Sequence, residues 1–136
     1  MRPILLDTCA ILWAGEKDGL SVAALESIKA ADEAGVPVLS SPISAWEIGL
    51  LVARGRIALP TAPGEWFASF LAQGIALAPM TPQILVDSSF LPGSRLRDPA
   101  DKIIAATARA MGYRVMTRDG PLLDYASAGH VQAIAC

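Results

Sequence analysis

Histidine and cysteine are scarce in this sequence of 136 residues. The one histidine, His130, excludes every chemistry that needs two histidines and argues against a His-rich zinc site, so a bound metal ion would be held by oxygen atoms. The two cysteines, Cys9 and Cys136, form neither a CxxC pair nor a disulfide framework. They indicate reduced thiols, and therefore a cytoplasmic protein.

Long apolar runs and an excess of positive charge are also absent. No run reaches the roughly 20 apolar residues that cross a bilayer, and the segment before Asp7 is too short for a signal peptide. The net charge of −2 provides no general basic field for nucleic acid, so such binding would depend on local arginines. The composition, 53% hydrophobic and 18% charged, excludes disorder and predicts a single domain over residues 1–136.

Short apolar strands alternate with helical segments along the whole chain. We expect a polar turn over 15–19 and, in the second helix, an apolar face made of Val22, Leu25, Ile28 and Ala31. The alternation predicts an α/β sandwich with a mainly parallel sheet covered on both faces, which binds ligands at the carboxyl ends of its strands. Strands are predicted at 4–6, 36–39, 75–78, 113–116 and 131–134, and helices at 9–13, 21–34, 44–54, 63–73, 81–90, 99–111 and 121–126.

The segment from Arg97 to Ala106 predicts the start of a buried helix with two carboxylates near its first turn. Asp98 suits the N-cap, and Pro99 suits the first helical position. Asp101 then lies beside the helix N-terminus, where backbone N–H groups and the helix dipole stabilise an anion.

Three further acids are expected near the same place. Asp7 and Asp119 each follow a predicted strand directly, which puts both at the carboxyl edge of a parallel sheet. Glu47 is expected at the third helical position of a capping box that begins with Ser44. Each of these acids also has an ordinary structural interpretation as a helix cap or turn residue.

The joint pattern of these acids favours a metal site. A cluster of like charges is unfavourable unless a cation neutralises it or some of the groups take up protons. Carboxylate oxygens without histidine or cysteine suit Mg²⁺ or Mn²⁺. Such an ion can activate water and stabilise an in-line displacement at phosphorus.

Four segments together resemble the PIN-domain family, and more closely the VapC-type ribonuclease toxins of bacterial toxin–antitoxin pairs. They occur in the expected order and span nearly the whole chain. Ala100 stands where this variant of the motif often has an aromatic residue, and Lys102 stands where arginine is usual. The segments are Leu5-Leu6-Asp7-Thr8, Ser44-Ala45-Trp46-Glu47-Ile48, Asp98 to Ala106, and Thr117-Arg118-Asp119.

The resemblance implies a three-layer α/β/α domain whose acidic pocket binds Mg²⁺ or Mn²⁺ and cleaves RNA. It also implies a homodimer and a cognate antitoxin protein that covers the pocket. The residues that match the family's catalytic and metal-binding positions are Asp7, Glu47, Asp101 and Asp119, with Asp98, Thr8 and Thr117 in possible supporting roles.

Cations and tryptophans near these motifs leave two interpretations open. The cations could hold RNA phosphates, or they could be solvated and pair with the acids. The tryptophans, Trp13, Trp46 and Trp66, are expected mainly in the core, with Trp46 as a candidate for a partner surface. The four cations are Arg95, Arg97, Lys102 and Arg118.

Three other classes of protein compete with a nuclease. A receiver-like signalling module would need a lysine after a late strand, but the last lysine, Lys102, is at a helix start. A phosphatase of the haloacid dehalogenase type would need an Asp-x-Asp pair, and Asp7-Thr8-Cys9 lacks the second acid. A PIN fold kept only for binding is disfavoured because all four acids are intact.

Overall fold

The computed structural model describes residues 1–16 and 19–136, so the turn predicted over 15–19 lies partly outside the described residues. None of the helices in this part of the chain has the length and apolar character needed to cross a membrane. In chain order the elements are β1 (Ile4–Leu6), α1 (Thr8–Ala14), α2 (Val22–Glu33), β2 (Val38–Ser40), α3 (Pro42–Ala53), α4 (Pro63–Leu71), β3 (Ala76–Leu77), α5 (Pro82–Asp87), α6 (Pro99–Met111), β4 (Arg114–Thr117), α7 (Gly120–Ser127) and β5 (Gln132–Ala135).

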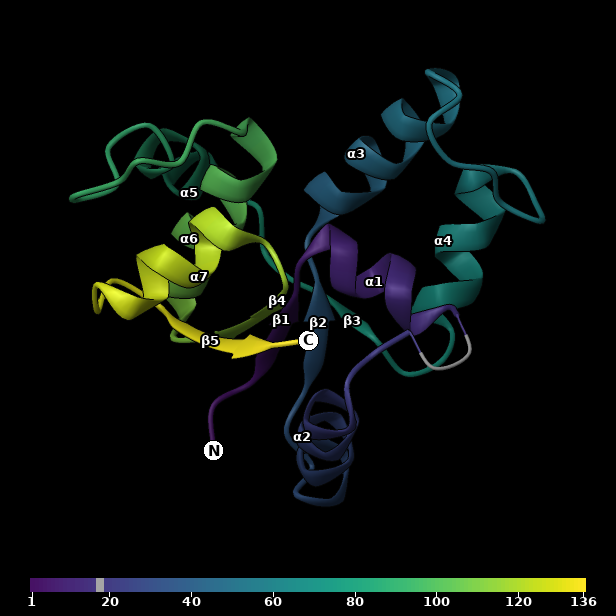
Figure 1. Cartoon of the computed structure of the whole chain (residues 1–136), viewed down its shortest axis with the longest axis horizontal. Coiled ribbons are helices and arrows are strands. Elements are labelled where there is room, and N and C mark those ends of the chain that lie inside the picture. Colours follow the sequence, from purple (N-terminus) through teal and green to yellow (C-terminus); the bar gives the residue numbers. More distant parts are fainter. Residues whose placement is uncertain (17–18) are drawn as a thin grey trace.

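The strands form one sheet in the order β3-β2-β1-β4-β5, and every neighbouring pair is parallel. In Figure 1, α5, α6 and α7 gather on one side of this sheet, while α1, α3 and α4 lie on the other. The predicted fold class, a three-layer α/β/α sandwich around a parallel sheet, is confirmed. Because β1 is the middle strand, the residue that follows it lies at the centre of the carboxyl edge.

The alternation of side chains along β1 separates two cores. Ile4 and Leu6 pack in the cluster that includes Ile11 of α1 and Ile48 of α3. Leu5 points to the opposite face of the sheet, where it packs with Ile104 of α6. All these side chains are at most 1% exposed. The run Ile4-Leu5-Leu6 is apolar throughout because both faces of a parallel sheet are covered.

Helix α6 forms as the sequence predicts. Asp98 is its N-cap, Pro99 follows at the start, and the helix ends at Gly112, whose φ of 72° is the left-handed conformation that glycine adopts without strain. Ala100, Ile104 and other small or apolar residues of this helix are buried against the sheet. The carboxylates at its N-terminus are therefore held by a fixed element.

The predicted capping box at Ser44 is wrong. Helix α3 begins at Pro42, and its N-cap is Ser41, whose hydroxyl accepts a hydrogen bond of 3.2 Å from the Ile43 N–H. Proline favours the first helical position because it has no N–H to leave unpaired there. Ser44 consequently lies inside the first turn, fully buried, and Glu47 lies one turn further along α3.

Two expectations about apolar faces also fail. On α2 the predicted face is wrong for Val22 and Leu25, which are 72% and 52% exposed, but Ala31 is buried and Ile28 packs against the core as expected. The helix packs through Ala24 in place of the two exposed residues. Of the tryptophans, Trp66 packs in the core beside Phe70, but Trp13 is 38% exposed and Trp46 is 54% exposed. Trp46 therefore lies at the surface, which was the other interpretation of this residue.

Some predicted boundaries also move. Strand β2 runs over Val38–Ser40 and so starts two residues after the predicted start at Val36, because Pro37 has no N–H to donate to a sheet. Helix α5 ends at Asp87, three residues before the predicted end at Phe90, and the side chain of Phe90 is 79% exposed. Neither change moves the ends of β1 and β4.

We expect Leu5→Ala to lower the free energy of unfolding by about 2–5 kcal/mol, because it removes a fully buried side chain from the middle strand and leaves a cavity. Urea denaturation would measure the loss. The control is Leu25→Ala on α2, which we expect to change stability by no more than about 0.5 kcal/mol. Equal losses in the two variants would contradict this view of the core.

Candidate active site

Three of the predicted acids cap helices that start at the carboxyl edge of the sheet. Asp7 caps α1 and accepts a 2.8 Å hydrogen bond from the Thr8 N–H. Asp98 caps α6 and accepts one of 2.8 Å from the Ala100 N–H. Asp119 caps α7, accepting from the Leu122 N–H. The interpretation of these three acids as helix caps is therefore confirmed. Because the three helices start at the same edge of the sheet, their N-terminal acids also converge on one region of the surface.

That place is a cavity of about 400 Å³, which we call the acidic pocket. It brings together all four acids predicted as catalytic, and Asp98 as well. Thr8 also lines it, whereas Arg95, Arg97 and Lys102 do not. The catalytic roles themselves stay predictions. The lining residues are Asp7, Thr8, Cys9, Leu12, Glu47, Leu51, Asp98, Asp101, Arg118 and Asp119.

Thr117, at the end of β4, connects two of these acids, Asp7 and Asp119, through hydrogen bonds of its side chain. Its buried hydroxyl donates a 2.7 Å hydrogen bond to Oδ2 of Asp7 and accepts one of 2.9 Å from the Asp119 N–H. The Cys9 thiol donates a second hydrogen bond, of 3.2 Å, to the same oxygen of Asp7. Together with the Thr8 N–H, these donors fix the orientation of the Asp7 carboxylate.

Burial and mutual repulsion disfavour negative charge in the pocket. Burial, followed by repulsion from Asp7, Asp119, Asp98 and Glu47, raises the pKa of Asp101 to about 8. Burial is also the main cause that raises the pKa of Asp7 and the pKa of Glu47 above their ordinary values. A cation bound in the pocket would stabilise the ionised carboxylates. Without a cation, the repulsion among them is relieved only when some of them take up protons.

Arg118 lines the pocket, but its guanidinium is occupied elsewhere. Nη2 donates hydrogen bonds of 2.7 Å to the carbonyl oxygens of Gly19 and Cys136. The same group lies 4.2 Å from the centre of the Trp13 ring, a cation–π contact. A contact between Arg118 and an RNA phosphate would therefore require an exchange of these partners.

The donor chemistry of the pocket fits a hard divalent cation. Its acids offer oxygen ligands, and burial raises the pKa of the Cys9 thiol to about 12, so that thiol stays protonated at neutral pH. Within residues 1–16 and 19–136, no three His, Cys, Asp or Glu side chains stand close enough together to hold a metal ion as they are placed. Asp101, whose carboxylate accepts no hydrogen bond from these residues, is the acid least restrained from moving toward a cation.

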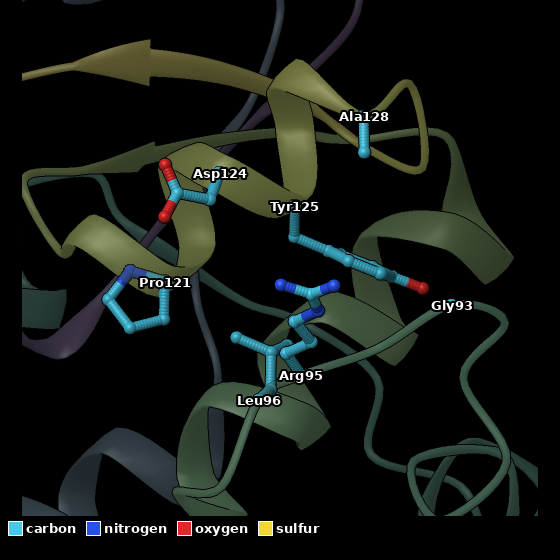
Figure 2. Close-up of a pocket in the computed structure, with 7 residues that line it drawn as sticks. All are labelled: Gly93, Arg95, Leu96, Pro121, Asp124, Tyr125 and Ala128. Carbon is cyan, nitrogen blue, oxygen red and sulfur yellow. The ribbon is translucent and has the colours of Figure 1, made fainter.

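Arg95 points into a different cavity, of about 520 Å³, between the loop before α6 and helix α7. Figure 2 shows its guanidinium directed toward Tyr125, with Asp124 on the same helix as that tyrosine. The Tyr125 hydroxyl donates a 2.7 Å hydrogen bond to the carbonyl of Pro92, which ties α7 to the loop. No acid of the acidic pocket lines this larger cavity, so its size does not make it the candidate active site.

Ser44 supports the site through Thr8, a role that was not predicted from the sequence. Its buried hydroxyl lies 2.9 Å from the hydroxyl of Thr8, and a hydrogen bond from Thr8 lowers the pKa of Glu47, partly offsetting the effect of burial. The signal that could have revealed it is spacing, because Ser44 precedes Glu47 by three residues on α3 and thus shares its face. Cys9, which the sequence indicated only as a reduced thiol, also lines the acidic pocket.

A parallel α/β/α sandwich with an acidic pocket at its carboxyl edge is the arrangement that the resemblance in the sequence implied. The PIN domain family model matches residues 4–127, and the chain belongs to this family. It is 36% identical over 126 residues to Ribonuclease VapC22 of Mycobacterium tuberculosis, a match that covers 92% of this chain and 93% of that protein.

Solved structures support the same fold. The chain is similar to one in the crystal structure of VapBC2 from Rickettsia felis bound to a DNA fragment from their promoter, with a TM-score of 0.72, 13% identity and 98% of both chains covered. It is also similar to one in DNA-bound VapBC from Salmonella typhimurium, with a TM-score of 0.68, 15% identity, and 99% of this chain and 98% of that chain covered. At these sequence identities, the structural similarity is evidence for the fold only.

We expect Thr117→Val to lower the free energy of unfolding by about 1–3 kcal/mol, because the buried Asp7 carboxylate and the Asp119 N–H each lose a partner. Thr117→Ser keeps the hydroxyl and is the matched control. Urea denaturation of the two variants beside the wild type measures the difference. A valine variant as stable as the serine variant would show that the hydroxyl contributes nothing.

The metal-free protein should become less stable as the pH rises from about 4 to about 8. The pKa of Asp101 is about 8 in the folded protein, against an ordinary value of 3.8, so between these values the folded state keeps a proton that the unfolded state has lost. The stabilisation that this retained proton gives is complete below pH 3.8 and is lost as the pH rises to about 8. The partial exposure of the group limits the effect to on the order of 1–2 kcal/mol.

Urea denaturation in EDTA, at several pH values across this range, tests the expectation. Asp101→Asn should remove part of the slope and should be more stable than the wild type near pH 8, because it carries no charge. The exposed Asp124→Asn, outside the acidic pocket, should keep the wild-type slope. Identical slopes in the wild type and Asp101→Asn would contradict the assignment.

Proposed function

We propose that this protein is a metal-dependent ribonuclease that cleaves RNA phosphodiester bonds at the acidic pocket. The observation that carries the proposal is the convergence of Asp7, Glu47, Asp101 and Asp119 on one cavity. Burial there raises the pKa values of Asp7, Glu47 and Asp101. The 36% identity to a protein named Ribonuclease VapC22 supports RNA as the substrate.

Asp7, Asp101 and Asp119 would hold Mg²⁺ or Mn²⁺, and Glu47 would hold the ion or a water molecule from across the pocket. A divalent ion bound there would supply an activated water for in-line attack at phosphorus and would stabilise the departing 3′ oxygen. Hydrogen bonds from Thr117, Cys9 and the Thr8 N–H keep Asp7 fixed. Pre-organised ligands of this kind reduce the reorganisation that the reaction requires.

The side chains of the pocket support water as the attacking group. The Cys9 thiol, whose pKa burial raises to about 12, donates its hydrogen to Asp7 and is a poor nucleophile. The hydroxyls of Thr8 and Thr117 are used in hydrogen bonds and have no histidine beside them. Their role is to orient carboxylates.

We further propose that the protein is the toxin of a toxin–antitoxin pair, that it acts in the cytoplasm, and that it forms a homodimer. The similar solved structures come from VapBC systems, and VapBC-5 from Mycobacterium tuberculosis, at 19% identity and a TM-score of 0.60, is described as a member of a toxin–antitoxin family. Exposed apolar side chains on and after α5, namely those of Leu85, Val86 and Phe90, are consistent with a protein interface.

The other candidate classes gain no support from the geometry. Lys102, the residue that a receiver-like module would require after a late strand, lies in the first turns of α6 and does not line the acidic pocket. The position that would hold the second acid of a haloacid dehalogenase phosphatase is Cys9.

The decisive test is incubation of the purified protein with a mixed RNA pool in Mg²⁺, in Mn²⁺ and in EDTA. We expect cleavage with at least one metal, none in EDTA, and a loss of about 100-fold or more in Asp101→Asn, because the substitution removes a charged group that would bind the ion. Gel electrophoresis of the RNA measures the rates.

The matched control is Asp124→Asn, which removes an exposed acid from α7 outside the pocket and should cleave as the wild type does. If the wild type and Asp101→Asn have the same activity with both metals, the proposed chemistry fails.

A further inference from the structure

Trp46 is the largest side chain on the outer surface of α3, and more than half of it, 54%, is exposed. It directly precedes Glu47, which lines the acidic pocket. Helices α3 and α6 pack together, and Figure 1 shows α3 on one side of the carboxyl edge and α6 and α7 on the other. The exposed ring of Trp46 offers a large flat surface on which a ligand or partner can pack.

Trp46 borders a second cavity of about 340 Å³, which we call the Trp46 groove. The groove and the acidic pocket have three lining residues in common, namely Glu47, Leu51 and Asp98. The two cavities are therefore adjacent, unlike the cavity of Figure 2, which shares no lining residue with the acidic pocket. The other lining residues of the groove are Trp46, Leu50, Arg54, Arg56 and Pro99.

Arg54 and Arg56 give the far end of the groove a positive charge. Both are exposed, and neither side chain forms an ion pair or a hydrogen bond within the described residues, where the one ion pair joins Lys29 and Glu33. Arg109, Arg114 and Arg118, in contrast, donate hydrogen bonds to backbone carbonyls. The groove thus leads from the acidic pocket, past an aromatic ring, to two available guanidinium groups.

We propose that the Trp46 groove binds the nucleotide next to the cleaved phosphodiester of a single-stranded RNA. The base stacks on Trp46, and Arg54 and Arg56 bind the adjoining phosphates. This inference rests on the proposed ribonuclease function and adds the path of the substrate to it. Stacking on an aromatic ring beside a cationic path is how proteins bind single strands without reading their sequence.

The combination of charges favours RNA over a protein partner as the occupant. A purely apolar partner would leave two guanidinium groups uncompensated at the end of the groove. A polyanion meets them directly, and a cation held by the acidic pocket would screen its scissile phosphate from the carboxylates. A net charge of −2 makes such local arginines the source of affinity for RNA.

The test measures RNA binding separately from cleavage. Asp101→Asn is the background, so that the probe, a fluorescently labelled single-stranded RNA of mixed sequence, stays intact. Anisotropy titrations at several salt concentrations then compare Trp46→Ala, Trp46→Phe and the double variant Arg54→Gln/Arg56→Gln. The controls, Leu25→Ala and Lys29→Gln, change an equally exposed apolar residue and an exposed cation on α2.

We expect Trp46→Ala to weaken binding about 5- to 150-fold, and Trp46→Phe to keep most of the affinity because it retains a ring for stacking. The double arginine variant should reduce the slope of log affinity against log salt by about 1.4, since each lost phosphate contact on a single strand contributes about 0.7. The α2 variants should bind as the background does. Circular dichroism melts would show that all variants fold.

The outcomes separate this inference from the ribonuclease proposal. If Trp46→Ala and the double arginine variant bind like the controls while the wild type cleaves RNA, the groove is overturned and the nuclease stands. If the wild type binds RNA without cleaving it, the ribonuclease proposal fails. The loss of RNA affinity in Trp46→Ala and in the double arginine variant then still tests the groove. If Trp46→Ala and the double arginine variant change the oligomeric state on size-exclusion chromatography but not the affinity for RNA, the groove is a protein interface and the inference is wrong. If no RNA binds to the Asp101→Asn background, the groove proposal fails, and cleavage by the wild type alone decides about the nuclease.

Discussion

The hydroxyl of Thr117 is the contact on which the arrangement of the site depends. It donates to Asp7, which follows β1, and accepts from the N–H of Asp119, which follows β4. These two strands are neighbours in the centre of the sheet, so one buried side chain connects the two loops that leave its carboxyl edge. A buried carboxylate needs donors, and here the donor also fixes its distance from a second carboxylate.

The acids at this edge do two tasks at once. Asp7, Asp98 and Asp119 satisfy backbone N–H groups at the starts of α1, α6 and α7, so each one stabilises a helix whether or not an ion is bound. The positive ends of those helices offset part of the repulsion among the carboxylates. Asp101 and Glu47 cap no helix, and burial raises the pKa of both. These two acids therefore have no capping task that would oppose the binding of a cation, whereas Asp7, whose pKa burial also raises, caps α1 as well.

Local sequence patterns predicted most of the fold because strands, caps and glycine stops depend on neighbouring residues, as in α6 (Pro99–Met111), which Gly112 ends. They placed Asp7 and Asp119 correctly because any residue after a parallel strand lies at the same edge. The strand order and the contact between Thr117 and Asp7, 110 residues apart in sequence, depend on tertiary packing and could not be predicted. Ser44 was assigned to the wrong task because the competing start at Pro42 was overlooked.

A protein with more acids than basic residues must still bind a polyanion if it cleaves RNA, and the distribution of its charges explains how. The carboxylates are withdrawn into a pocket where a cation would cancel them, whereas Arg54 and Arg56 remain exposed beside it. Between these charges lies Trp46, whose ring attracts bases of any kind and is insensitive to salt in itself. For a protein that cleaves RNA in this way, net charge would be a poor guide to binding, because electrostatic attraction is screened within about 10 Å and only the charged groups that border the path of the strand would contribute.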